Sequence, residues 1–178
     1  ALGDGVLGGA TPTTISTLSS EFSFGTTFAT AGYFQLNTSY LTSMRDNVVD
    51  EATNTTQLFT TALHEIGHII GIGPLTFSSS SITSKPVVEY TDGLDSTTKY
   101  YYTGANALQY YKYYYPSYAS GLVGIPIEDD GGGGTAMGHP EEGTMGTTSE
   151  NDRYINGKFH PGLQHELMTG WSDSGKYL

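Results

Sequence analysis

The strongest periodic pattern in the chain lies between residues 55 and 71. Apolar residues recur there at steps of three and four, as on one face of an α-helix: Leu58, Phe59, Ala62, Leu63, Ile66, Ile69 and Ile70. Thr55 or Thr56 stands where an N-cap is expected, and Gly71 stands where a left-handed residue ends many helices. The pattern predicts an amphipathic helix that Gly73 and Pro74 prevent from continuing.

Elsewhere the pattern changes from short strands and turns to irregular chain. Within the first fifty residues, Phe34 and Leu36 alternate with polar neighbours, which suits a half-buried strand. Residues 75–100 predict an irregular excursion with one short strand at residues 87–90. A second helix is expected after Gly104, ending before Pro116. Its crowded tyrosines favour packing with a wet hydroxyl rim over a sugar- or peptide-binding platform.

Composition narrows the class of protein. A chain of 178 residues fits one domain, and 7 basic against 18 acidic residues give a net charge of -11. Such acidity argues against nucleic acid or an anionic membrane as a partner, and it suits a secreted or cell-surface protein. No apolar run is long enough for a membrane span. Because there is no cysteine, any metal site must use histidines and carboxylates.

The candidate chemistry lies on the first predicted helix, in the segment HEIGHIIGIG. Residues four apart project from the same helix face, so His64 and His68 can direct their imidazoles at one ion while Glu65 reaches a bound water. A zinc ion held by three neutral ligands keeps an open position and lowers the pKa of its water towards about 7. The motif therefore predicts metal-assisted peptide hydrolysis, with Glu65 as the general base.

The motif HExxHxxG, followed later by a methionine, resembles the metzincin metallopeptidases. Most metzincins carry the third histidine three residues after the glycine, where this chain has Pro74. The chain is more similar to the leishmanolysin-like branch, whose members insert a long segment there. Its stretches VLGGATP, HEIGHIIGIG, YTGANAL, GIPIEDDGGGGTAMGH and ELMTG follow that branch in order. The resemblance implies that Gly71 turns the chain, that His139 is the third zinc ligand and that Met168 lies beneath the metal.

Two other histidines compete with His139 for the third position. His160 and His165 lie nearer to Met168 in the sequence, and the family usually places its third histidine about a dozen residues before the methionine. An insertion of roughly TMGTTSENDRYINGKFH would explain the longer spacing from His139. The assignment stays open at this point, with His139 preferred.

The resemblance also implies a fold. We expect a single α+β catalytic domain over residues 1–178, metzincin-like and two-lobed, with a twisted sheet and the active-site helix in an upper lobe (about 1–71). An irregular lower lobe would cover about 72–178. The backing helix that precedes VLGGA in metzincins and the helix that follows the methionine are both absent from the sequence. We therefore expect the chain to be incomplete at both ends and part of a longer polypeptide or a larger assembly.

Acidic residues flank the Gly-rich loop: Glu128, Asp129, Asp130, Glu141 and Glu142. Carboxylates clustered beside glycines could hold calcium. Their spacing matches no known calcium loop, so a solvated acidic loop is the preferred interpretation.

Two functions from different classes remain. The first is a zinc endopeptidase that cleaves extended polypeptides, bound along an edge strand for which GYFQLNTSY is the candidate. The alternative is a non-catalytic structural or adhesive component of a larger extracellular or virion assembly that retains the fold. The set of His64, Glu65 and His68 favours the enzyme, because a structural zinc site would need no Glu65 and would prefer four protein ligands.

Overall fold

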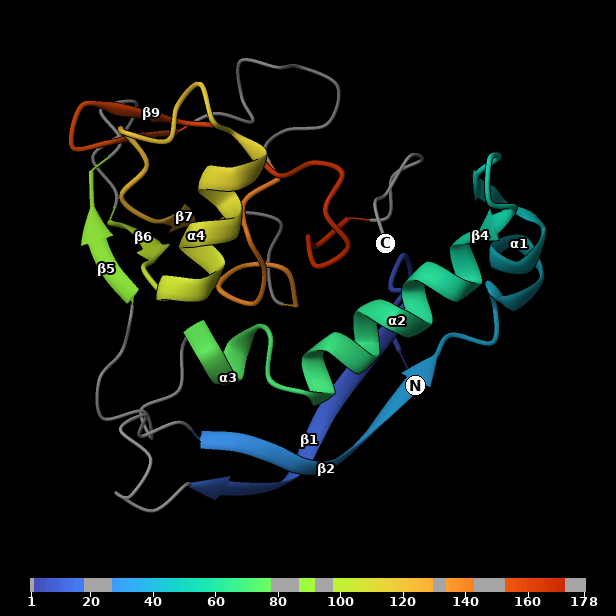
Figure 1. Ribbon diagram of the computed structural model, residues 1–178. Coiled ribbons are helices and arrows are strands. Elements are labelled where there is room, and N and C mark those ends of the chain that lie inside the picture. Colours follow the sequence, from blue (N-terminus) through green and yellow to red (C-terminus); the bar gives the residue numbers. More distant parts are fainter. Residues whose placement is uncertain are drawn as a thin grey trace. The chain divides into compact units, whose positions relative to one another are not determined.

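The computed structural model describes residues 2–17, 27–77, 87–91, 98–129, 134–142 and 153–171. The chain divides into two compact units. The first unit comprises residues 1–83, 165–168 and 172–178, and the second comprises residues 84–164 and 169–171. Both units combine short helices with small antiparallel sheets, which confirms the α+β class (Figure 1). The predicted boundary between lobes near residue 71 stays a prediction.

In the first unit, the helix α2 (Gln57–Ile69) packs along a β-hairpin (Figure 1). Strands β1 (Gly8–Thr17) and β2 (Thr27–Leu36) pair antiparallel, with Gly8 opposite Leu36 and register shifts between Pro12 and Ile15. The other elements of this unit are α1 (Leu41–Asp46), β3 (Val48–Asp50), β4 (Thr55–Thr56), α2 (Gln57–Ile69) and α3 (Pro74–Phe77). The first half of the candidate motif thus lies on the longest helix of the described chain, supported by the hairpin.

The predicted ends of α2 are confirmed. Thr56 is its N-cap, and the threonine hydroxyl accepts a hydrogen bond from the Phe59 N–H. Gly71 and Gly73 have φ of 112° and 118°, conformations that L side chains rarely adopt, so the chain can leave the helix there. Pro74 opens the short helix α3 instead of simply ending the preceding one, as suits a residue whose missing N–H is not needed in a first turn.

The burial of α2 differs from its hydrophobic pattern. Its buried side chains include Thr60, Thr61 and Glu65, whereas Phe59 is 52%, Ile66 41% and Ile70 65% exposed. Three of the seven apolar positions that predicted the helix therefore form an exposed stripe. The period of the pattern identified the helix correctly, but the apolar face is only partly covered.

In the second unit, a three-stranded antiparallel sheet lies beside one helix. The strands β5 (Val87–Tyr90), β6 (Lys99–Tyr102) and β7 (Ile125–Pro126) are paired in that order. The helix α4 (Ala105–Tyr114) and the hairpin of β8 (Arg153–Ile155) and β9 (Lys158–His160) complete it. One core cluster joins Tyr90, Tyr101 and Ile155, and another joins Tyr111, Leu122 and Leu163.

The sequence predicted β5 and α4 correctly and missed α1, β6 and the β8–β9 hairpin. That hairpin turns at Asn156 and Gly157, with φ of 52° and 73°, the left-handed pair that a tight two-residue turn requires. It falls within the segment interpreted as an insertion, of which residues 144–152 lie outside the described residues.

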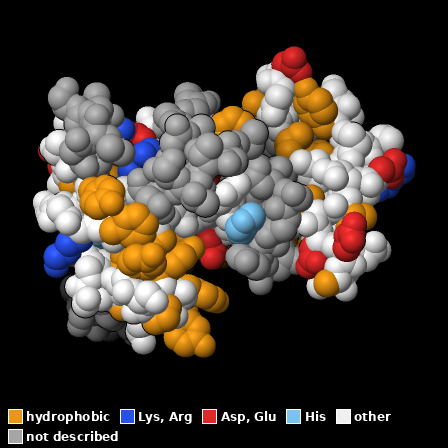
Figure 2. Space-filling model, turned by 90° about the horizontal axis from the view of Figure 1, so that it is seen from above, with side chains coloured by type: hydrophobic (Ala, Val, Ile, Leu, Met, Phe, Trp, Pro, Cys, Tyr) orange, Lys and Arg blue, Asp and Glu red, His pale blue; other side chains and the backbone are white. Residues whose placement is uncertain are grey.

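The tyrosines of α4 divide between core and surface. Tyr111 is 3% exposed, whereas Tyr110, Tyr113 and Tyr114 are 65% to 75% exposed. Figure 2 shows hydrophobic side chains gathered on the surface of this unit. In the part of the chain that is described, no helix is both long and apolar enough to cross a bilayer.

Candidate metal centre

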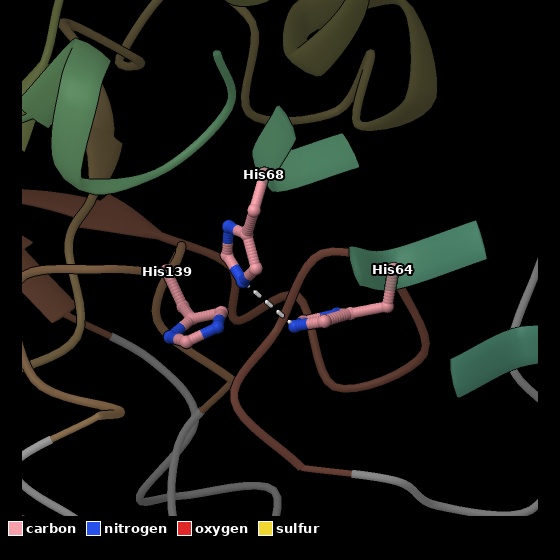
Figure 3. Close-up of side chains that lie close together, drawn as sticks. All are labelled: His64, His68 and His139. Carbon is pink, nitrogen blue, oxygen red and sulfur yellow. Dashed lines mark hydrogen bonds between the residues drawn. The ribbon is translucent and has the colours of Figure 1, made fainter. Parts of the chain in front are cut away.

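His64 and His68 face one another from successive turns of α2. Their Nε2 atoms lie 2.9 Å apart, and the rings meet edge to face at an interplanar angle of 89° (Figure 3). The i and i+4 spacing on a capped helix produces this juxtaposition, as the sequence predicted. The pair lies wholly within the first unit.

The other nitrogen of each ring is held by a backbone carbonyl. His64 Nδ1 lies 2.8 Å from the Leu167 oxygen, and His68 Nδ1 lies 2.7 Å from the Ile72 oxygen. A carbonyl can only accept, so each Nδ1 carries the proton and each Nε2 carries the lone pair in the neutral ring. Two lone pairs that face each other at 2.9 Å repel unless a cation lies between them. The arrangement therefore suits a metal ion bound through both Nε2 atoms.

The chain beyond α2 supplies one of these carbonyls. The Ile72 N–H donates to the Gly67 oxygen at 3.0 Å, which returns the chain to the helix end, and the Ile72 carbonyl then meets His68. Gly71, with its positive φ, makes this return without steric cost. Burial lowers the pKa of His68, although the bond to Ile72 opposes that change.

Glu65 lies buried against the start of the hairpin. Glu65 is 5% exposed, and a Cβ placed on Gly8 would lie 2.5 Å from the Glu65 Oε1 atom. Gly8 thus leaves room for the carboxylate in the position that it takes. Desolvation raises the pKa of Glu65 from 4.5 to about 7, and Oε2 has no hydrogen-bond partner among the described residues. Glu65 can therefore exchange a proton near neutral pH.

Met168 packs against α2 at Gly67, which lies between His64 and His68 in the sequence. The three atoms nearest to a Cβ placed on Gly67 all belong to Met168, with Cε at 2.8 Å and the sulfur closer still. Gly67 is thus the position where the helix admits the thioether, and Leu167, the residue before Met168, supplies the carbonyl that holds His64. Gly67 was not singled out from the sequence, since a glycine inside a helix gives no sign of what lies against it.

His139, in the second unit, has the same kind of support. It is 4% exposed, and its Nδ1 lies 2.8 Å from the Thr135 oxygen, so its Nε2 also carries the lone pair. The preceding chain turns at Gly134 and Met137, with φ of 112° and 61°. His64, His68 and His139 together make a group that could hold a metal ion (Figure 3).

His160 and His165 belong to neither metal-ligand group found among the described residues. His160 is fully buried, its Nδ1 lies 2.9 Å from the Lys158 oxygen, and its Nε2 accepts the Val123 N–H at 3.0 Å. Both of its nitrogens thus stabilise the fold of the second unit. His165 is exposed.

The expectation of a solvated acidic loop is wrong for three of its members. Glu128, Glu141 and Glu142 are only 1% to 2% exposed. Asp129 is partly buried and pairs with Lys99 and Arg153, whereas Asp130 lies outside the described residues. Spacing along the chain could not show this burial, because the residues that cover these carboxylates come from distant segments.

Comparisons of the chain with models of known protein families, with curated proteins and with solved structures find no match.

Proposed function

We propose that this protein is a leishmanolysin-like zinc endopeptidase of metzincin fold, acting outside the cell, with His64, His68 and His139 as ligands. The observation that carries the proposal is the pair of Nε2 atoms at 2.9 Å, with both Nδ1 protons directed at carbonyls. Zn–N bonds of about 2.0–2.1 Å at a tetrahedral angle hold two nitrogens roughly 3.3 Å apart. The rings need to separate by only about 0.4 Å to accept the ion.

The donor set fits zinc. Imidazole is a good zinc ligand, and three neutral histidines with no cysteine in the chain match catalytic rather than closed structural sites. When bound, zinc would lower the pKa of a water molecule towards about 7 and polarise the scissile carbonyl. The backbone bonds at the three Nδ1 atoms fix the tautomers and orient the rings before the metal arrives.

In this proposal, Glu65 acts as the general base. It adjoins His64 in α2, and burial brings its pKa to about 7, where a base both accepts and releases protons efficiently at neutral pH. Glu65 takes a proton from the attacking water and returns it to the leaving amine. Met168 packs beneath the helix at Gly67, and we assign it a packing role rather than a bond to the metal.

A second candidate function is a structural or adhesive component of a larger assembly. The exposed stripe of Phe59, Ile66 and Ile70 supports this alternative, because apolar surface of this kind is commonly covered by a partner. The burial of Glu65 beside the histidines supports the enzyme instead. Its Oε2 has no hydrogen-bond partner among the described residues, and a structural metal site gains nothing from such a carboxylate.

The test compares the purified chain with Glu65→Ala and His64→Ala, using Glu89→Ala as a control at an exposed carboxylate. We expect about one zinc per chain and cleavage of a denatured protein substrate. Glu65→Ala should retain the zinc and lose at least about 100-fold in cleavage rate, whereas His64→Ala should lose both. Glu89→Ala should match the parent. Zinc-loaded parent protein that cleaves no faster than Glu65→Ala would refute the enzymatic proposal and favour the alternative.

A further inference from the structure

We propose that the second unit binds a calcium ion through the carboxylates of Glu128, Asp129, Glu141 and Glu142. Glu128, Asp129 and Glu141 each offer an oxygen, and these oxygens lie within 4.8 Å of one another. The proposal is independent of the zinc site, because all four residues belong to the second unit and none is a zinc ligand.

Two basic side chains lie among the acids of this cluster. Lys99 and Arg153 are its basic members: Lys99 pairs with Asp129, and Arg153 lies 3.5 Å from Asp129 and 3.0 Å from Glu141. Burying a carboxylate costs several kcal/mol unless its charge is compensated, and a divalent cation held by several of these oxygens would offset that cost.

Glu142 gives a second and separate indication of a ligand. The residue is 1% exposed, and its Oε1 is buried with no hydrogen-bond partner among the described residues, while Oε2 accepts the Gly170 N–H at 3.3 Å. Burial first, and then the charge of Glu128, raises the pKa of Glu142 to about 9. Its carboxyl therefore faces the other acids with an oxygen that nothing described satisfies, as a metal ligand would before the ion binds.

The chemistry of the donors selects calcium. All four are carboxylates, which can bind in one- or two-oxygen mode and supply the 6–8 oxygens that calcium takes at about 2.3–2.6 Å. Magnesium keeps several waters, and side chains buried to this degree leave little room for them. Zinc prefers nitrogen or sulfur donors, which this cluster lacks.

The backbone ties this cluster to the segment that carries His139. The Glu128 N–H donates to the His139 carbonyl at 3.0 Å, and the Met137 N–H donates to the Glu128 carbonyl at 2.8 Å. Glu141 donates to the Pro126 carbonyl at 2.9 Å. An ion held by these side chains would therefore brace residues 126–129 against residues 137–141, with a measurable gain in stability.

The test uses the full chain, depleted of metals by chelation and then loaded with zinc to saturate the histidines. Calorimetric titration with calcium chloride should show about one further site, and 1 mM calcium should raise Tm by about 5 °C if Kd is near 10 µM. Magnesium chloride should do much less. Glu142→Gln should weaken calcium binding at least about 10-fold, whereas the control Glu89→Gln and the zinc-site variant His64→Ala should bind calcium as the parent does.

Folded parent protein that binds no calcium at 1 mM would overturn the proposal, as would Glu142→Gln that binds as tightly as the parent. Carboxylates that share protons instead of an ion are the competing explanation. In that case calcium would leave Tm unchanged, and this result would also refute the site. If Glu142→Gln does not fold, the titration of the parent and of His64→Ala still decides, and calcium binding that disappears in His64→Ala would assign the ion to the histidines.

Discussion

The contact between Gly67 and Met168 offers the sharpest test of the local geometry. A Cβ on Gly67 would lie 2.8 Å from Met168 Cε and closer still to the sulfur, well inside ordinary contact distance. Overpacking of this kind costs about 1–3 kcal/mol. Alanine has a higher helix propensity than glycine by about 1 kcal/mol, so Gly67→Ala should destabilise the protein by about 0–2 kcal/mol in total.

The free energy that couples the two positions separates packing from propensity. In a Met168→Ala background the clash is gone, and Gly67→Ala should then stabilise the protein by up to about 1 kcal/mol. We expect a coupling free energy of about 1–3 kcal/mol in a double-mutant cycle, measured by urea unfolding of the metal-free chain. The control cycle combines Gly67→Ala with Met44→Ala, because Met44 is fully buried in α1 of the same unit. The free energies of these two changes should be additive within about 0.5 kcal/mol. Coupling below that threshold between Gly67 and Met168 would refute the placement of the thioether against α2.

Two further predictions concern titration and the competing histidine. The folded-state pKa of Glu65, about 7, lies above its ordinary 4.5, so metal-free protein should lose about 3 kcal/mol of stability as pH rises from below 4.5 to above 7. In Glu65→Gln the free energy of unfolding, measured by urea titration, should differ less between pH 5 and pH 8 than in the parent. An unchanged difference would contradict this prediction. His160→Ala should cost about 1–3 kcal/mol, because it leaves the partly buried Val123 N–H without its acceptor, yet keep the zinc content of the parent. Loss of zinc from folded His160→Ala would instead identify His160 as a ligand.

The parts of the fold that were predicted from the sequence depend on local signals. The period of α2, its cap at Thr56 and its glycine exit are properties of adjacent residues, and all three are confirmed. The α4 helix ends before Pro116 for the same kind of reason. The strand β6 was missed because its tyrosines looked like part of a crowded aromatic run, and the β8–β9 hairpin was missed although Asn156 and Gly157 are a standard turn pair.

Burial was the property that the sequence predicted least well. Phe59, Ile66 and Ile70 are exposed although they belong to the apolar stripe, and Glu128 and Glu142 are buried although they belong to an acidic loop. Hydrophobic pattern reports what a residue prefers, whereas burial depends on which distant segments fold against it. For the acidic loop those segments include residues 99, 153 and 170, which contact Asp129, Glu141 and Glu142 respectively and are far from the loop in the chain.

The choice among the histidines shows what a single sequence lacks. Along the chain, His139 and His160 are equal in chemistry, and spacing to Met168 even favours His160. Their hydrogen bonds distinguish them: His160 uses its Nε2 to accept the Val123 N–H, whereas His139, like His64 and His68, directs its Nδ1 at a backbone carbonyl. A ring held through one nitrogen presents the other, with its lone pair, in a fixed direction. This shared arrangement, which no spacing rule reveals, is the reason why the proposed zinc site uses these three histidines.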